Sequence, residues 1–271
     1  MFDYLLERGI LSKKPILMPA DVEAEFFSIP YFEVNPPPKK RLPFTRHKDV
    51  WCYEHNRYQS PHDPNFWIDA SVYPAGFIAT MGPLDGTDFE GAADTRPHFW
   101  QMVHETKSRV IVMTTDLKEG PKLKCAQYWP DEEETYGKHT VLKKNEKRQD
   151  RLHIRELQVD DHALTHIHIL NWPDNCAFSC LENLEKAVDE ASQRCKEAPI
   201  IVHCSAGVGR TGSFISCYLI KKARSLGLYV NLPKLIHFLR KEGRVRSVEG
   251  LDQYKMIYAF ATKIESNITG A

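Results

Sequence analysis

The chain has 271 residues, of which 42% are hydrophobic and 27% charged, a balance typical of a globular protein that excludes a disordered or fibrous one. Its 36 basic and 36 acidic residues cancel, so no net charge draws it to nucleic acid or anionic lipid, and any anion site must be local. No apolar run approaches the roughly 18 residues of a membrane span, and the first residues lack the apolar stretch of a signal peptide.

A proline-rich stretch divides a short N-terminal part from one large domain. We expect residues 1–40 to form a helical lead-in and a proline-rich connector, with the stiff stretch at Asn35–Arg41, and residues 41–271 to form the domain. Runs rich in Ile and Val predict strands at Gly76–Thr80, Arg109–Thr114, His153–Val159, Thr165–Leu170 and Ile200–His203. Apolar residues at helical spacing predict helices at Pro97–Lys107, Asn183–Lys196, Thr211–Leu226, Leu232–Glu242 and Leu251–Ile264. The alternation predicts an α/β fold with a central twisted mixed sheet flanked by helices.

The most informative segment runs from Pro199 to Gly212, where a strand of β-branched residues leads through a short link into a helix. The link contains glycine, so its N–H groups can turn inward as an anion-binding nest at the N-terminus of that helix. Arg210 supplies a planar fork for two phosphate oxygens, and the thiol of Cys204 is expected to ionise readily and act as a nucleophile. A buried thiol or a tight turn explains each residue alone, but not the set Cys204, Gly207, Gly209, Arg210 and Thr211.

The Cys-x5-Arg pattern resembles the signature of the tyrosine-specific, cysteine-dependent protein tyrosine phosphatases. Other segments resemble motifs of this family in the same order, from about residue 50 to the C-terminus: His55–Tyr58, Trp67–Ser71, Thr80–Leu84, His98–Val103, Lys122–Pro130 and Asn171–Asp174. The resemblance implies one α/β catalytic domain that uses neither a metal nor a cofactor. It also implies hydrolysis of phosphotyrosine in proteins through a cysteinyl-phosphate intermediate.

The resemblance further implies a role for each matching residue. Cys204 would attack phosphorus, Arg210 would bind the phosphoryl oxygens, and Thr211 would donate a hydrogen bond to the departing thiolate. His203 would support the loop. Asp174 would be the general acid, because a tyrosinate with a parent pKa of about 10 needs a proton, and would then activate water. The phosphate would be held by the loop residues Ser205, Ala206, Gly207, Val208 and Gly209.

Further residues of the resemblance concern the substrate and the surroundings of the site. Tyr58 would stack on the substrate ring and deepen the cleft, which favours phosphotyrosine over the shorter phosphoserine. Gln253 matches the second of two glutamines of the family, while Glu249 replaces the glutamine that positions water. The supporting residues would be Glu119, Lys124 and Trp172.

The sequence departs from the family pattern at four places. The segment Gln59–Asp63 after Tyr58 is a shortened loop without an acid at the usual place, Asn175–Phe178 after Asp174 is atypical, and Met81 replaces a glutamine. The fourth departure is Glu249, because an ionised carboxylate only accepts hydrogen bonds, whereas an amide also donates them. Like charges at one site raise one of the two carboxyl pKa values, so we expect slow hydrolysis of the cysteinyl phosphate.

Several alternatives remain open at this point. His162, His166 and His168 would allow a metal site, but they resemble the core strand of the family. The mixed charges of Lys143–Arg148 predict a solvated hairpin, or a surface that selects acidic residues beside a phosphotyrosine. The main alternative function is a phosphotyrosine-binding, substrate-trapping module with weak or no turnover. Tyr58 disfavours a dual-specificity or lipid phosphatase, and a redox or sulfur-transfer enzyme would not require Asp174.

Expected partners are phosphotyrosine-containing proteins, without nucleic acid or a membrane span, and the chain is expected to be a monomer in signalling. Seven cysteines, an odd number, predict free thiols rather than a disulfide framework. Free thiols favour a reducing compartment, so the expected location is the cytoplasm, with the nucleus as an alternative.

Overall fold

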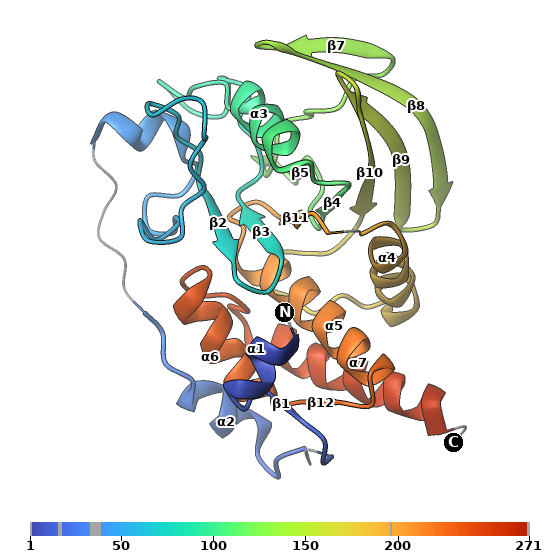
Figure 1. Ribbon diagram of the computed structural model, residues 1–271. Helices are drawn as coiled ribbons and strands as arrows, with labels where there is room; N and C mark the ends of the chain where they lie inside the picture. The colour runs from blue at the N-terminus through green and yellow to red at the C-terminus, as the bar shows by residue number, and fades with distance from the viewer. Residues whose placement is uncertain (1, 16–17, 33–38, 196, 270–271) are drawn as a thin grey trace.

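The computed structural model describes residues 2–15, 18–32, 39–195 and 197–269, and its main feature is a large mixed sheet (Figure 1). Eight strands pair in the order β2-β3-β11-β4-β10-β9-β8-β7. Strands β3, β11, β4 and β10 run parallel, and their other neighbours are antiparallel. The strands are β2 Ala70–Tyr73, β3 Phe77–Thr80, β4 Val110–Met113, β7 Glu133–Tyr136, β8 His139–Gln149, β9 Leu152–Val159, β10 His162–Ile169 and β11 Ile200–His203.

Helices cover both faces of this sheet (Figure 1). The side chains of Ile201 and Val202 in β11 point to opposite faces, because side chains alternate along a strand. Ile201 joins the core under α3, whereas Val202 joins the core built by the helices of the C-terminal half. These helices are α3 Arg96–Thr106 on one face and α4 Leu181–Arg194, α5 Gly209–Ser225, α6 Leu232–Glu242 and α7 Leu251–Thr269 on the other. The predicted sheet flanked by helices is confirmed.

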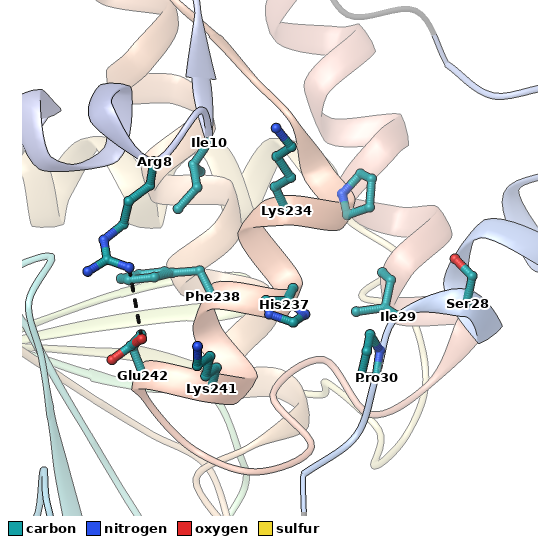
Figure 2. A pocket seen from close by; sticks show the side chains of 11 residues that line it. Arg8, Ile10, Ser28, Ile29, Pro30, Lys234, His237, Phe238, Lys241 and Glu242 are labelled. Carbon is teal, nitrogen blue, oxygen red and sulfur yellow. Dashed lines mark ion pairs between the residues drawn. The ribbon is translucent and has the colours of Figure 1, made fainter.

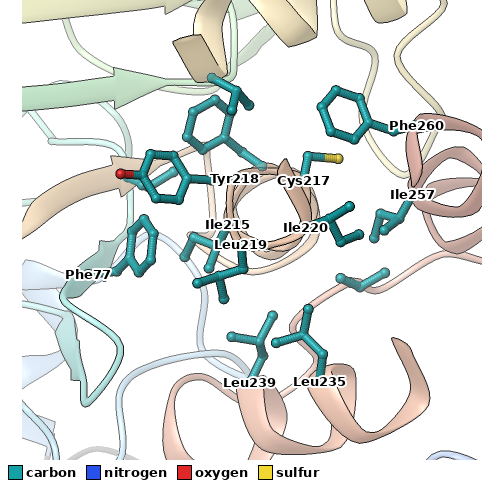
Figure 3. Close-up of a cluster of buried hydrophobic side chains, with 14 of the residues drawn as sticks. Phe77, Ile215, Cys217, Tyr218, Leu219, Ile220, Leu235, Leu239, Ile257 and Phe260 are labelled. Atoms are coloured by element: carbon teal, nitrogen blue, oxygen red, sulfur yellow. The ribbon is translucent and has the colours of Figure 1, made fainter. Parts of the chain in front are cut away.

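Helix α5 runs through the middle of the larger core. Figure 3 shows it end-on, with Leu219 and Ile220 directed at α6 and α7 and with Tyr218 against Phe77 of β3. These side chains are buried, as is the strand β11 that precedes the helix. The turn from β11 into α5 is therefore fixed on both sides by packed elements, and it carries Cys204.

Most predicted elements agree with the structure to within a few residues. Strand β11 and helix α6 have the predicted bounds, while strand β10 begins earlier than predicted, at His162. Its first residues pair with the end of β9 across a turn in which Asp160 has φ 53°, a pairing that the Val and Ile pattern does not reveal. The charged segment Lys143–Arg148 lies in β8 and pairs with β9, as expected for a hairpin.

The buried face of α7 differs from the predicted one. The predicted face contained Leu251, Tyr254, Tyr258 and Ala261, of which only Tyr254 is fully buried. The face that enters the core also contains Ile257, Phe260 and Ile264. The other three predicted residues lie at the border of this face and contact the core from the side.

The described part of the N-terminal segment packs against the C-terminal helices. Leu5 of α1 (Phe2–Glu7) and Phe26 of α2 (Val22–Ser28) belong to the larger core, and short strand β1 (Leu11–Ser12) pairs with β12 (Tyr229–Val230). A 3-10 helix, η1, spans Lys39–Phe44. Of the predicted connector Asn35–Arg41, the first residues up to Pro38 lie outside the described residues, and Lys39–Arg41 begin η1. No helix in the described ranges is long and apolar enough to cross a membrane.

Candidate active site

The link between β11 and α5 forms a tight loop, the Cys204 loop (residues 204–209). Gly207 has φ 77°, and a Cβ atom there would lie 2.3 Å from the carbonyl oxygen of Thr80, so only glycine fits. Its N–H donates to the Sγ atom of Cys204 at 3.2 Å. The loop is tied to the neighbouring chain by the N–H of Gly82, which donates to the carbonyl of Ser205 at 3.0 Å. Cys204 is therefore held below a turn of N–H groups at the start of α5.

Arg210 lies in the first turn of α5 and is almost fully buried. Its Nη1 donates to a Glu119 carboxylate oxygen and, at 2.7 Å, to the carbonyl of Trp172. Its Nη2 contacts Oδ1 of Asp174 at 3.1 Å. One guanidinium thus joins three segments that are far apart in the sequence: the Cys204 loop, the β5–β6 hairpin (Lys118–Glu119 and Lys122–Leu123) and the Asp174 loop (residues 171–178).

Asp174 lies at the mouth of the site with about half of its side chain exposed. Lys124 contacts its Oδ2 at 2.6 Å and reaches Glu119 at 3.5 Å. Partial burial acts to raise the pKa of Asp174, but the hydrogen bond from Lys124 and the charge of Arg210 outweigh it and lower the pKa. The carboxylate is therefore ionised at neutral pH when no other anion occupies the site.

The atypical residues after Asp174 anchor its loop. The indole N–H of Trp172 donates to the carbonyl of Cys176 at 3.0 Å, and its ring packs on Phe178 at 5.2 Å. Asn175 takes a φ of 56°, a left-handed conformation that asparagine tolerates well. The loop is thus closed by its own residues, with Trp172 buried beneath it.

Two hydroxyl groups and one imidazole complete the surroundings of Cys204. In the described part of the chain, the hydroxyl oxygens of Ser205 and Thr211 are buried and have no hydrogen-bond partner. A buried hydroxyl without a partner is costly, so both are available for a bound group or for the thiolate. His203 is fully buried, with Nδ1 3.1 Å from the Cys204 carbonyl oxygen and Nε2 2.7 Å from the Tyr128 hydroxyl.

The loop between α6 and α7, residues 243–250, brings a second carboxyl group to the site. Gln253 is fully buried, accepts from the N–H groups of Glu249 and Gly250 at 3.1 and 3.4 Å, and packs against Gly209. Burial raises the pKa of Glu249, the Arg246 charge opposes this, and the negative charge of Asp174 raises it further. Of the two carboxyl groups, Glu249 is therefore the one that holds a proton more readily.

Tyr58 does not lie at this site, which corrects the prediction that it walls the cleft. Its N–H donates to the carbonyl of Ala70, the first residue of β2, and this pairing directs the side chain under α3. There its hydroxyl donates to Glu105 at 2.8 Å and its ring packs on Phe66. The ring is buried and does not line the cavity beside Asp174.

A cavity of about 1090 Å³ opens beside Asp174 and Ser205, and its wall contains residues that sequence reasoning missed. The imidazole of His47 lines it; burial, and secondarily Arg46, lowers the pKa of His47, so the ring is neutral at neutral pH. Near it, Asp49 forms an ion pair with Arg246 at 3.1 Å. The sequence feature that could have predicted these lining residues is the run Thr45–Val50, where basic, aromatic and acidic residues follow one another. The other lining residues come from η1, from residues 88–91 and from residues 121–124.

A second cavity of about 360 Å³ lies between the N-terminal segment and α6 (Figure 2). Arg8, Lys234 and Lys241 surround it, and Arg8 reaches Glu242 at 4.0 Å. None of the described residues that meet at Cys204 lines it, whereas Asp174, Lys124 and Ser205 of the Cys204 loop line the larger cavity. The cavity beside Asp174 is therefore the candidate active site.

The histidines considered for a metal are occupied by protein partners. His162 and His168 lie 2.8 and 2.9 Å from backbone carbonyl oxygens, and His166 contacts Tyr128 and Arg155. A different group, His104, His139 and Asp160, has its ligand atoms within 4.8 Å of one another. There, however, His139 is hydrogen-bonded to Asp160, and the ammonium group of Lys107 lies 3.3 Å from Nε2 of His104 and competes for it.

A buried cysteine under a helix N-terminus, with a guanidinium and a carboxylate at the same spot, defines a class of site suited to covalent chemistry on an anionic group. Comparison with known proteins identifies the particular family that has this kind of site. Residues 42–263 match the family model described as protein-tyrosine phosphatase. The chain therefore belongs to the protein-tyrosine phosphatase family.

Individual relatives agree with this assignment. The chain is 31% identical over 248 residues to the rat tyrosine-protein phosphatase non-receptor type 2. The matched region covers 82% of this chain and 58% of the relative. It is 35% identical over 219 residues to human receptor-type tyrosine-protein phosphatase C, covering 71% of this chain and 16% of the relative. Tyrosine-protein phosphatase 2 of Dictyostelium discoideum is 34% identical over 212 residues, with coverages of 71% and 53%. The chain thus spans about half the length of two of these relatives and less of the third.

Proposed function

We propose that the chain hydrolyses phosphotyrosine in proteins through a cysteinyl-phosphate intermediate. The observation that carries this proposal is the convergence of Cys204, Arg210 and Asp174 on one spot, with Asp174 3.1 Å from the guanidinium. A phosphoryl group placed in the Cys204 loop is met by the loop N–H groups and by the fork of Arg210. The residues of the phosphate cradle are Ser205, Ala206, Gly207, Val208 and Gly209.

In the first step, Cys204 attacks phosphorus, the S–P bond forms and the P–O bond to tyrosine breaks. Asp174 gives its proton to the leaving oxygen. The dianionic phosphate takes over Arg210 from Asp174 and adds negative charge, both of which raise the pKa of Asp174 in the complex. The carboxyl group is thus ionised in the free protein and protonated when the substrate is bound.

In the second step, water attacks phosphorus, the S–P bond breaks and the thiolate leaves. Thr211 donates a hydrogen bond to that thiolate, and Asp174 accepts the proton of the water. Gln253 holds the backbone of Glu249, whose carboxyl group faces the same region and whose pKa is raised. While it is ionised, the Glu249 carboxylate only accepts hydrogen bonds, so it positions the attacking water less well than an amide would, and this step is slower than the first.

The cavity beside Asp174 supports a peptide substrate. His47 offers a flat, neutral ring at its wall, in the role first assigned to Tyr58. Lys39, Lys48 and Lys122 also line it, and no ion pair of these lysines exists among the described residues. Such a lining favours phosphorylated peptides with acidic neighbours. Glu119, Lys124 and Trp172 support the site by holding Arg210 and Asp174.

The second candidate is a phosphotyrosine-binding module that turns over poorly. The second carboxyl group near Asp174, that of Glu249, favours it, because negative charge there slows the attack of water on the cysteinyl phosphate. One experiment separates the two: steady-state hydrolysis of phosphotyrosine, phosphothreonine and phosphoinositide substrates by the purified chain with EDTA present. Multiple turnovers on phosphotyrosine alone support the enzyme, and binding without turnover supports the module.

The remaining expectations belong to the same proposal. Residues 41–271 form the catalytic domain, and residues 1–40 are its lead-in. The chain acts as a monomer on phosphotyrosine-containing proteins in cytoplasmic signalling, with the nucleus as a second location. Its odd number of cysteines, seven, suits a reducing compartment.

A further inference from the structure

A continuous chain of buried hydrogen bonds connects strand β9 to the Cys204 loop. Nη1 of Arg155 lies 3.2 Å from Nδ1 of His166. Nε2 of His166 lies 2.8 Å from the hydroxyl of Tyr128, and this hydroxyl lies 2.7 Å from Nε2 of His203. Nδ1 of His203 lies 3.1 Å from the carbonyl oxygen of Cys204. All four side chains are buried.

The charge state of the imidazoles limits where the protons can lie. Burial lowers the pKa of His203 to about 4, and burial with the Arg155 charge lowers that of His166 well below its usual value. Both rings are therefore neutral at neutral pH, and each has one N–H donor and one acceptor nitrogen. Tyr128 remains protonated, because burial raises its pKa.

The partners then fix each proton in turn. Nδ1 of His203 faces a carbonyl oxygen, so it carries the proton and Nε2 must accept from Tyr128. Tyr128 has a single hydroxyl hydrogen, so its oxygen accepts from Nε2–H of His166. Nδ1 of His166 is then an acceptor and needs a donor, which is Arg155. A guanidinium is the side chain suited to this place, because it only donates and stays charged.

His168 supports the same assignment independently. Its Nε2 lies 2.9 Å from the carbonyl of Thr115 and must carry the proton, so Nδ1 accepts from Nη1 of Arg155 at 3.4 Å. One NH2 group thus serves two imidazoles with its two hydrogens. Glu146 holds the other side of the guanidinium at 2.8 Å, and the face of Trp129 lies 4.4 Å from it.

We propose that Arg155 is a positioning residue of the active site, which sets the proton positions of His166 and Tyr128 and so keeps His203 bonded to the carbonyl of Cys204. Its effect on turnover rests on the proposed function, in which Cys204 is the nucleophile. Without Arg155, His166 is free to carry its proton on Nδ1 and to accept from Tyr128. The single Tyr128 hydrogen is then shared between two rings, and Nε2 of His203 loses its donor for part of the time.

The direct test is the imidazole tautomer, measured by long-range ¹H–¹⁵N NMR on the full chain with labelled histidine. In the unaltered chain we expect protons on Nε2 of His166 and on Nδ1 of His203. Arg155→Met shifts His166 toward the Nδ1–H form, whereas the control Arg148→Met, a more exposed partner of Glu146 on β8, leaves the tautomers unchanged. An Nδ1–H tautomer of His166 in the unaltered chain, or an unchanged tautomer in Arg155→Met, overturns the proposal.

A kinetic cycle with Tyr128→Phe adds a readout that a purely structural role would not move. Each single substitution is expected to lower kcat by about three- to tenfold, the size of one net hydrogen bond. Because Arg155 acts through Tyr128, the double variant should be no slower than the slower single variant. If the double variant lowers kcat by the product of the two single effects, Arg155 does not act through Tyr128. If Arg155→Met does not fold, Arg155→Gln replaces it in both measurements, because an amide both donates and accepts and so does not fix the proton of His166.

The two measurements also separate this proposal from the proposed function. The tautomers are observed without any substrate. If a chain shows the expected tautomers but does not hydrolyse phosphotyrosine, the role of Arg155 is supported and the proposed function is refuted. Hydrolysis of phosphotyrosine by a chain in which His166 carries its proton on Nδ1 would support the proposed function and refute the role of Arg155.

Discussion

The Cys204 loop and the Asp174 loop face each other across the site, but they are held in different ways. The Cys204 loop is fixed by its own backbone: Gly207 fits against Thr80, and α5 follows at once. The Asp174 carboxylate is placed by charges from elsewhere, Lys124 and Arg210. The first loop is therefore a rigid part of the core, whereas the position of the acid depends on ion pairs that a bound phosphate rearranges.

This difference separates binding from proton transfer. Changes in the Cys204 loop should remove the chemistry or the binding of phosphate altogether. Changes in the facing loops should alter rates, pH dependence or the balance of the two steps. The following substitutions test this division, from the largest expected effect to the smallest.

Cys204→Ser should abolish turnover and keep binding of a phosphotyrosine peptide, because the cradle of N–H groups and Arg210 remains without its nucleophile. Arg210→Ala should lose both, since the phosphate loses its bidentate partner. Isothermal titration and steady-state hydrolysis on the same preparations check this. Appreciable hydrolysis by Cys204→Ser would show that the thiol is not the nucleophile.

Asp174→Ala should lower kcat on phosphotyrosine peptides by about 100- to 10,000-fold, the usual contribution of a general acid–base group. The loss should shrink for aryl phosphates whose leaving groups need no proton. A series of aryl phosphates of differing leaving-group pKa measures this, with thermal melting as the control for folding. An equal loss across the series contradicts the assignment of Asp174 as the acid.

His47→Ala should raise KM for phosphotyrosine peptides by about two- to tenfold, because the substrate ring loses a flat partner. Tyr58→Phe should leave KM unchanged and lower stability by about 0.5–1.5 kcal/mol, because Glu105 loses a partly buried hydrogen bond. Peptide kinetics and denaturant unfolding of the two variants give the comparison. If KM were raised in Tyr58→Phe and unchanged in His47→Ala, Tyr58 rather than His47 would be the residue that stacks on the substrate ring.

Glu249→Gln should speed the steady phase of hydrolysis by about two- to tenfold, the size of one hydrogen bond to the attacking water. In the unaltered chain, rapid mixing should show a burst of released phenol followed by a slower steady rate. The absence of a burst, together with an unchanged or reduced rate in Glu249→Gln, would show that this residue does not limit the second step.

Lys124→Met should change the pH profile more than the maximal rate. Lys124 lowers the pKa of Asp174, so its removal raises that pKa and keeps the acid protonated to higher pH. The limb on which kcat falls with rising pH reports the acid in the enzyme–substrate complex, so this limb should move to higher pH. Lys122→Met, which removes a neighbouring lysine that has no contact with Asp174 among the described residues, is the control. A limb that stays in place, or moves in the control as well, would argue against Lys124 as the cause.

Local sequence patterns predicted the elements that build the site. The Ile-Ile-Val run of β11, the small link and Arg210 define a strand, a turn and a helix start within fourteen residues, Pro199 to Gly212. Because these constraints act between close neighbours in the chain, they are visible in the sequence. The placement of Cys204, Arg210 and Thr211 together follows from them.

The tertiary structure decided what lies opposite that loop. Tyr58 and His47 are both aromatic residues near the family motifs, and only the pairing of the Tyr58 backbone beside β2 directs Tyr58 under α3 and leaves His47 at the cavity. The proton positions around His203 likewise depend on Arg155, which is distant in sequence and adjacent through the β9–β10 pairing. Burial and charge at such contacts come from chain segments that meet only in the folded state, so no local pattern reveals them.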